Sequence, residues 1–482
     1  MKLLNLFSLL IICISSKDFD PNQYNSLIIY QVMVSSFQSG DDSRGYGEGY
    51  GPSSHKGDLR GIINALDYIK DLNVNTLWLT PIFDSTSNGR DRKLQSTGYF
   101  ANDYFNVDPN FGTNEIFREL VQKAHEKGLY VLLDGVFGHH GSNTKASPKG
   151  RYPQGGDDPV SYPGSLDFFR EVAQHWINEY EIDGWRLDQC YQMNQGNYNY
   201  MKEIREAIES CCLARKKAGK QWGTLGYIVG EDWHGPDDIQ RQTYSGAGLR
   251  SAFDFPSRYC IVKTLAQEES GAGGDGIDTM MYVFKSPNEK GYHHDLGYVY
   301  PYLFITNHDV QRFGNLIRSK YGYGQSNGDY WKRYKMAIAC LASYTGPVTI
   351  YYGDEVGDIV ECWPNCGSNV GGDNMARSDG HIKDFNYNQQ DLHDYTKKLF
   401  EIKSQHPACW RGNNSPRNSN GCLVNIKWDS ITGEKIVFVL NKETYNKDVY
   451  VGQGEMQDLV TGKTYNNNVN MEGLTAGIFL VK

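Results

Sequence analysis

The sequence has little that would suit a membrane or a nucleic-acid partner. Its long apolar run, from Leu3 to Ile14, is too short to span a bilayer. Positive charge is scarce, because 48 Lys and Arg face 57 Asp and Glu, for a formal net charge of -9. No second CxxC or HxxxH pair completes a zinc site. With 482 residues, 39% hydrophobic and 22% charged, the composition is typical of a globular protein with more than one domain.

The N-terminus has the pattern of a secretory signal peptide. Lys2 precedes the apolar run, and the small residues Ser15 and Ser16 follow it. This arrangement predicts a signal peptide over residues 1–16, and therefore a secreted or lumenal protein that no longer contacts the membrane after cleavage. The alternative is a buried N-terminal strand.

The ten cysteines include Cys13 in this leader, so an odd number remains. At least one must stay unpaired unless it bridges to another chain. Cys362 and Cys366 are close enough for a local disulfide, and Cys409 and Cys422 flank a polar loop as a second plausible pair.

Short apolar runs alternate with amphipathic stretches along most of the chain. The runs are LIIYQVMV, VNTLWLT, LYVLLDGVF, EIDGWRLD, GYIVGE, LRSAFDF, YLFITN and PVTIYYG. The stretches between them include GIINALDYIKDL, NEIFRELVQKAHEKG and LDFFREVAQHWINEY, whose apolar residues recur at the helical period. This rhythm predicts an α/β protein whose (β/α)₈ barrel covers residues 17–406, with a short loop domain at 140–166 after the third strand. Runs after residue 407 predict a small antiparallel β-sandwich domain over 407–482.

Charged residues end several of the predicted strands. Arg186 and Asp188 are two apart and project from the same face of their strand, so the guanidinium keeps the carboxylate ionised and oriented. Asp134 and Glu231 end two other strands, and Asp309 with His308 ends a further one. In a barrel these ends share one face, where active sites lie.

DGVFGH, GWRLD, GED and TNHD, in this order, resemble the four short motifs that define the α-amylase family of retaining glycoside hydrolases. The segments IYQVMVSSF, STGYFANDYFNVDPNFGT and TGPVTIYYGDE are similar to other parts of the same family, so the resemblance covers essentially the whole mature sequence.

The resemblance implies three catalytic acids. Asp188 is expected to be the nucleophile, Glu231 the acid and base, and Asp309 the group that holds sugar hydroxyls and stabilises the transition state. Glu231 would need a raised pKa for this role.

The same resemblance implies a set of supporting residues. Arg186 is expected to keep Asp188 charged, His139 and His308 to donate hydrogen bonds to the sugar, and Tyr99 to stack on its ring. Asp134 is as compatible with supporting Arg186 as with facing substrate, and Arg377 is a weaker candidate for a substrate hydroxyl.

Two positions depart from the family pattern. The first motif usually carries an Asn that ligates a structural calcium, but Gly138 stands there and offers no side-chain oxygen. Where amylases often have Lys-His after the nucleophile, this chain has Tyr191 and Gln192. No metal ligand or cofactor is therefore firmly implied, and Asp157 and Asp158 are the remaining candidate oxygen ligands.

The leading hypothesis is a secreted retaining hydrolase of α-glucosidic bonds, α-1,4 above all, in starch-like glucans or maltooligosaccharides. The same motifs serve α-glucosidases, cyclomaltodextrinases and transglycosylases. A hypothesis from another class is a catalytically silent barrel used as a binding or transporter-associated module. The sequence leaves linkage, endo or exo attack and oligomeric state open.

Overall fold

The computed structural model describes residues 19–293, 296–297 and 299–482. The predicted signal peptide at 1–16 lies outside this part of the chain. Within the described residues, no helix is both long and apolar enough to cross a membrane.

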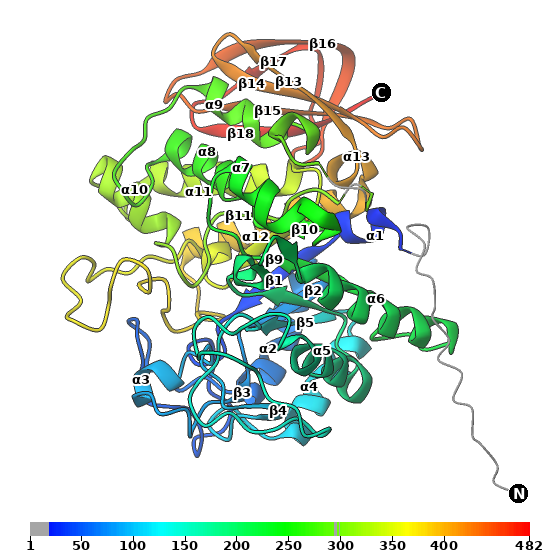
Figure 1. Ribbon diagram of the computed structural model, residues 1–482. Helices are drawn as coiled ribbons and strands as arrows, with labels where there is room; N and C mark the ends of the chain where they lie inside the picture. The colour runs from blue at the N-terminus through cyan, green and yellow to red at the C-terminus, as the bar shows by residue number, and fades with distance from the viewer. Residues whose placement is uncertain (1–18, 294–295, 298) are drawn as a thin grey trace, which may run out of the picture.

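Eight parallel strands form the central sheet. In spatial order they are β10 (Ser251–Ala252), β9 (Tyr227–Gly230), β6 (Gly184–Leu187), β5 (Tyr130–Gly135), β2 (Thr76–Leu79), β1 (Ile28–Val32), β12 (Val348–Tyr351) and β11 (Leu303–Phe304). A parallel bridge between Phe253 and Tyr302 joins the two ends of this order, so the sheet closes into a barrel. The predicted (β/α)₈ fold is confirmed, and each of the eight apolar runs contributes one strand (Figure 1).

Helices surround the barrel on its outer side. They are α2 (Leu59–Asp71), α4 (Asn114–Glu126), α5 (Leu166–Tyr180), α6 (Met201–Lys217), α8 (Phe255–Leu265), α10 (Phe313–Tyr321), α11 (Gly328–Ser343) and α12 (Tyr387–Gln405). Local chemistry sets their ends: the Asp58 carboxylate accepts from the Gly61 N–H at the start of α2, and the Thr113 hydroxyl caps α4. Gly128, at φ 71°, follows the end of α4 in the left-handed conformation that favours glycine.

Two apolar layers hold the barrel together. The inner layer fills the barrel with large rings, including Trp78, Tyr227, Phe253 and Tyr302. The outer layer lies between the strands and the helices. Because the interior is packed, only the rim of the barrel offers room for a site.

Several short elements belong to the loops that rise above the rim. They are β3 (Phe83–Asp84), α3 (Arg92–Gln95), β4 (Asp103–Val107), β7 (Asn194–Gln195), β8 (Tyr198–Asn199) and α7 (Pro236–Ile239). Two others lie elsewhere: α1 (Pro21–Asn25) precedes β1, at the amino-terminal end of the barrel, and α9 (Ile277–Met281) contacts the C-terminal sheet. The loop after β5 runs to the start of α5 with one isolated bridge, Gly155 to Val160. The loop after β12 contains the expected disulfide between Cys362 and Cys366.

The second suggested disulfide is wrong. Cys409 and Cys422 are both free and buried. Cys409 lies in α13 (Pro407–Trp410), whereas Cys422 begins a strand and packs in the apolar cluster of the C-terminal sheet, with Val424 and Val437. The two thiols therefore pack in different apolar clusters and do not meet.

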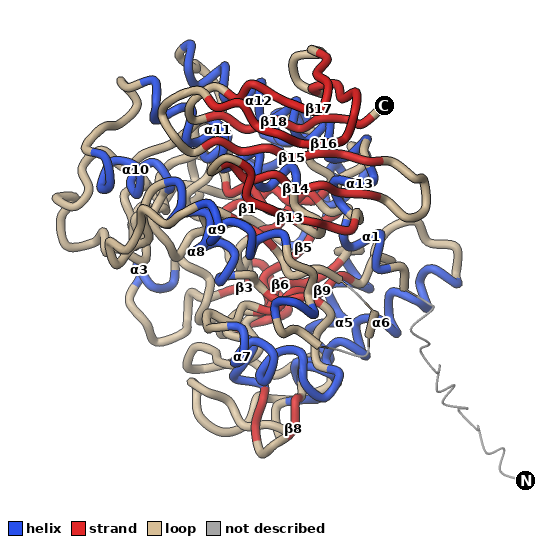
Figure 2. The backbone as a smooth tube through the Cα atoms, turned by 90° about the horizontal axis from the view of Figure 1, so that it is seen from above, coloured by secondary structure: helices blue, strands red, loops and turns tan. Residues whose placement is uncertain are grey.

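The C-terminal strands form one antiparallel sheet of six, in place of the two separate sheets of a sandwich. Its order is β13 (Asn413–Ser419), β14 (Cys422–Trp428), β15 (Lys435–Asn441), β18 (Thr475–Val481), β16 (Lys447–Asp458) and β17 (Thr464–Met471). A register shift in β16 between Tyr450 and Glu455 lets the sheet curl, and the Arg417 side chain of β13 donates to the Val451 carbonyl. One face packs on α11 through β18, beside the barrel (Figure 2).

Candidate active site

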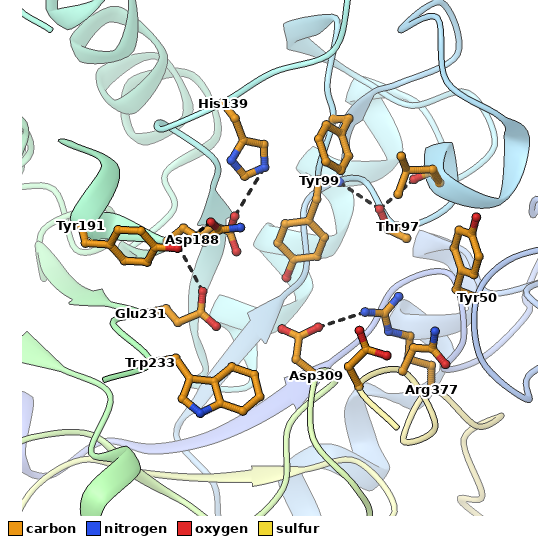
Figure 3. A pocket seen from close by; sticks show the side chains of 15 residues that line it. Tyr50, Thr97, Tyr99, His139, Asp188, Tyr191, Glu231, Trp233, Asp309 and Arg377 are labelled. Atoms are coloured by element: carbon orange, nitrogen blue, oxygen red, sulfur yellow. Dashed lines mark hydrogen bonds and ion pairs between the residues drawn. The ribbon is translucent and has the colours of Figure 1, made fainter. Parts of the chain in front are cut away.

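A cavity of about 630 Å³ opens at the carboxyl ends of the barrel strands. Figure 3 shows the side chains that line it converging from loops after different strands. The lining residues are Tyr50, Leu94, Thr97, Tyr99, Phe100, His139, Asp188, Gln189, Tyr191, Glu231, Trp233, Asp309, Asp373, Asn374 and Arg377. All three predicted catalytic acids are among them.

Arg186 lies beneath the cavity and connects the acids. Its Nη1 donates to Asp134 Oδ1 at 2.7 Å and to Asp188 Oδ1 at 2.9 Å. Its Nη2 is 2.9 Å from Glu231 Oε2. The strands explain this arrangement, because Asp134 of β5 pairs directly with Arg186 of β6 in register. Arg186 is fully buried and does not line the cavity. Asp134 contacts Arg186, which agrees with the first of the two roles expected for it, support of Arg186 and not contact with substrate.

The guanidinium of Arg186 sits over the aromatic floor of the barrel, about equally far from two rings. Its carbon is 5.6 Å from the ring centres of both Trp78 and Phe253. Burial opposes the charge, but the carboxylates of Asp134 and Glu231 raise the pKa of Arg186 well above its ordinary value. The group therefore stays cationic beneath the acids.

Glu231 follows β9 and is 6% exposed. Burial raises its pKa from 4.5 to about 8; Arg186 opposes this shift, while Asp188 and Asp309 add to it. Gln189 donates its backbone N–H to Glu231 Oε2 at 3.1 Å, and does so from a left-handed conformation at φ 39°. Such a conformation is costly for a residue with a side chain, so the turn after Asp188 holds strain next to the acids.

Asp309 lies on the opposite wall of the cavity. Burial alone would raise its pKa, but neighbouring groups, Arg377 among them, lower it; the Arg377 Nη2 donates to Asp309 Oδ1 at 2.9 Å. Arg377 also donates through Nε to the His308 carbonyl at 3.0 Å. Arg377 thus lines the cavity and fixes the acid beside it.

The predicted sugar-contacting residues divide into two groups. His139 and Tyr99 line the cavity, and His139 Nε2 is 3.6 Å from Asp188 Oδ2. His308 is fully buried behind the wall, where its Nε2 is 3.0 Å from Asp309 Oδ2 and its ring stacks on Tyr99 at 5.4 Å between centres. Burial lowers the pKa of His308 to about 3, so its ring is neutral at ordinary pH.

Sequence reasoning missed three aromatic residues of the cavity, Tyr50, Phe100 and Trp233. Trp233 is 41% exposed, and its ring stacks on Phe255 at 4.8 Å with an angle of 7°. Its Nε1 donates to the Tyr259 hydroxyl at 2.8 Å, so the ring is fixed from two sides. Tyr50 comes from the loop after β1. Trp233 could have been found from its position two residues after Glu231, whereas Tyr50 has no comparable signal.

The residues around Gly138 do not fit the calcium site that the family resemblance implies. A side chain at position 138 would collide with Gln192, whose Oε1 lies 2.0 Å from an ideal Cβ there. The candidate ligands are already engaged, since Asp157 Oδ2 accepts from Ser142 and Asp158 Oδ1 accepts from Gln192. Across the described residues, no three His, Cys, Asp or Glu side chains gather in a group that could hold a metal ion.

Comparison with known proteins agrees with this geometry. The sequence matches the family described as "Alpha amylase, catalytic domain" over residues 31–153 and 167–421. A cyclomaltodextrinase of Thermoanaerobacter pseudethanolicus is 26% identical over 95% of this chain and 78% of its own length. An intracellular maltogenic amylase of Bacillus subtilis is 28% identical over 64% of this chain, which spans half of that protein's length.

Solved structures extend the likeness to the whole fold. The crystal structure of AmyP in complex with maltose has a TM-score of 0.89, with 38% identity over 97% of this chain and 98% of AmyP. The structure of AmyP E221Q in complex with maltotriose gives 0.90 over 98% of this chain and 99% of that one. With the family match covering most of the barrel and three acids around one cavity, the chain belongs to the α-amylase family of glycoside hydrolases.

Proposed function

We propose that this enzyme hydrolyses α-glucosidic bonds, chiefly α-1,4, in starch-like glucans or maltooligosaccharides, with retention of anomeric configuration. Asp188 attacks the anomeric carbon and forms a glycosyl ester, while Glu231 protonates the leaving oxygen. Glu231 then deprotonates a water molecule that opens the ester. Asp309 holds hydroxyls of the sugar being cleaved. His139 and Tyr99 shape that subsite, and His308 supports Tyr99 and Asp309 from behind the wall.

The observation that carries this proposal is the sharing of Arg186. Its two terminal nitrogens are each 2.9 Å from one carboxyl group, Asp188 on Nη1 and Glu231 on Nη2. The two acids are therefore neighbours on one cation. Asp188 accepts a hydrogen bond from it, which suits a nucleophile, whereas burial and the neighbouring acids raise the pKa of Glu231 to about 8, which suits a proton donor.

Product analysis tests the reaction. Purified enzyme should release maltose and short maltooligosaccharides from starch, resolved by chromatography, whereas Asp188→Asn prepared in parallel should release none. Failure of the wild-type enzyme on starch, maltooligosaccharides, cyclodextrin and pullulan alike would refute the proposed substrate class and favour a silent binding module.

A second candidate is a cyclomaltodextrinase. It is favoured by the likeness to the Thermoanaerobacter pseudethanolicus cyclomaltodextrinase over 95% of this chain. Cleavage of cyclodextrin at least as fast as of soluble starch, in the same product analysis, would support it over an amylase. An α-glucosidase would release glucose from chain ends, and a transglycosylase would lengthen part of the maltooligosaccharide pool.

Secretion remains a further part of the proposal. It is supported by the leader at residues 1–16, with one basic residue, an apolar run and small residues after it. N-terminal sequencing of protein from the medium of expressing cells should begin near Lys17. Protein retained in the cells with an intact Met1 would contradict secretion without affecting the proposed reaction.

A further inference from the structure

The two departures from the family pattern, Gly138 and Gln192, are a single packing feature. An ideal Cβ at position 138 would lie 2.0 Å from Gln192 Oε1 and 2.7 Å from Gln192 Cβ. Gly138 does not have a positive φ, so its backbone conformation does not require glycine. Glycine is needed there because the Gln192 carboxamide occupies the space that a side chain would fill.

That carboxamide connects the loops that follow two neighbouring strands. Gln192 lies in a 3₁₀ turn after β6, and its Nε2 donates to Asp158 Oδ1 of the loop after β5 at 3.0 Å. The same nitrogen is 3.4 Å from Gln189 Oε1. Its Oε1 is 3.2 Å from His139 Nδ1. One amide thus joins the loop that carries His139 to the turn that follows the nucleophile.

The network fixes which way the amide points and which ring nitrogen carries hydrogen. Both partners of Gln192 Nε2 are oxygen acceptors, so an inverted amide would face them with its own oxygen. A carboxamide oxygen can only accept, and His139 Nδ1 must therefore carry a hydrogen. The other nitrogen, Nε2, is 3.6 Å from Asp188 Oδ2. In the neutral ring it carries no hydrogen and accepts one from a sugar hydroxyl, in place of the donation that the family resemblance implies.

We propose that Gln192 is a positioning residue for His139, and that its amide is a cross-link between these two loops. The proposal for Gln192 rests on the proposed function in one respect, because it assumes that Asp188, which His139 faces, is the nucleophile. The ring is 2% exposed and tilts on Phe100 at 5.1 Å between centres, so packing limits its position and Gln192 sets its rotation and tautomer.

A second amide provides a matched control three residues away. Gln195 donates through Nε2 to the Val160 carbonyl at 2.8 Å and accepts the Tyr162 N–H at 3.0 Å. It joins the same two loops and also donates to the Gln192 backbone carbonyl at 2.8 Å, but its side chain has no hydrogen bond to His139. Loss of Gln195 therefore removes cross-links without removing the hydrogen bond to the ring.

The first experiment compares Gln192→Met with Gln195→Met in the full chain. Methionine keeps the length of the side chain and removes its hydrogen bonds. Both variants should lose a few degrees in Tm. Gln192→Met alone should lower kcat, by about 100-fold, because a ring displaced by about 1 Å no longer meets the reacting sugar. Gln195→Met should retain kcat within about threefold.

The second readout does not depend on turnover. In protein labelled with ¹⁵N-histidine, and with the His139 signals assigned through His139→Gln, Nδ1 of the free wild-type enzyme should carry hydrogen. The same should hold in Gln195→Met, whereas in Gln192→Met the hydrogen should redistribute between the two nitrogens. Wild-type protein with Nδ1 unprotonated would overturn the proposal, even if glucan hydrolysis is confirmed. Equal kcat in both methionine variants would also overturn it.

A double-mutant cycle tests the packing directly. Gly138→Ala alone should reduce kcat/KM by at least tenfold, because the new Cβ displaces the amide. In the Gln192→Gly background the same change should cost less than about threefold, since the colliding atoms are gone. Equal effects in both backgrounds would show that Gly138 and Gln192 act independently, and would refute the claim that they form a single packing feature. Wild-type activity in the same assay tests the proposed function separately.

Discussion

The raised pKa of Glu231 predicts that the stability of the protein depends on pH, and this can be measured without measuring turnover. The folded protein holds the proton up to about pH 8, whereas the unfolded chain releases it near 4.5. Between these values unfolding releases a proton, so stability falls as pH rises through the window. Below 4.5 both states are protonated and the contribution is constant.

The Glu231→Gln variant removes this titration and keeps the shape of the group. The glutamine oxygen can still accept from the Gln189 N–H, as Glu231 Oε2 does, and stays beside Arg186 Nη2. Each pH unit inside the window corresponds to about 1.4 kcal/mol. From about pH 5 to about pH 7.5, the variant should therefore gain about 3 kcal/mol relative to wild type.

Thermal unfolding of both proteins at the two pH values measures this gain. For a chain of this size, about 3 kcal/mol corresponds to a Tm difference that grows by roughly 3 °C from the lower to the higher pH. Glu119 offers a control of opposite sign, because hydrogen bonds from Arg60 and Lys123 lower its pKa to about 2. Glu119→Gln should lose a little stability at neutral pH. A Tm difference for Glu231→Gln that stays constant between the two pH values would refute the raised pKa.

Four other predictions follow from the site. Asp188→Asn should fold normally but lower kcat by about 10⁴-fold or more, and activity within about tenfold of wild type would rule out the nucleophile assignment. Proton NMR early in hydrolysis should show the α-anomer first; the β-anomer appearing first would exclude double displacement. Arg377→Met removes a cation that lowers the pKa of Asp309, so the acidic limb of the kcat/KM profile should move to higher pH, and an unmoved limb would argue against the ion pair. EDTA should change Tm by less than about 2 °C; a drop above about 10 °C that calcium reverses would reveal an ion site.

The barrel could be predicted because its strands are buried on both sides and read as continuous apolar runs. The C-terminal sheet was predicted only where its strands contain apolar runs. β14, β15, β16 and β18 match apolar runs, but β13 and β17 have the sequences NNSPRNS and TYNNNVNM. These two are the edge strands of the sheet, where Pro416 costs no ladder hydrogen bond inside the sheet and polar side chains face solvent. An edge strand has too few buried positions to show a pattern.

The site was predictable to the extent that its residues end strands. Asp188, Glu231 and Asp309 do so, and closure of the barrel brings them to one rim. Tyr50 and Asp373 belong to long loops after β1 and β12, whose paths depend on contacts between distant segments, such as the Gly51 N–H donating to the Asn369 carbonyl. No local pattern encodes those contacts, so loop residues entered the site only with the structure.

The distribution of charge explains why one site can hold both a nucleophile and an acid. Two guanidinium groups, those of Arg186 and Arg377, form ion pairs with the carboxyl groups around the cavity and beneath it. Arg186 contacts Asp134, Asp188 and Glu231, while Arg377 contacts Asp309. His308 adds no charge at neutral pH, because burial lowers its pKa to about 3. With four acids and two cations in a buried space, full ionisation would leave uncompensated negative charge, which favours retention of a proton. Burial raises the pKa of Asp134 to about 7 and that of Glu231 to about 8, so Glu231, from which the reaction needs a proton, holds it to the higher pH.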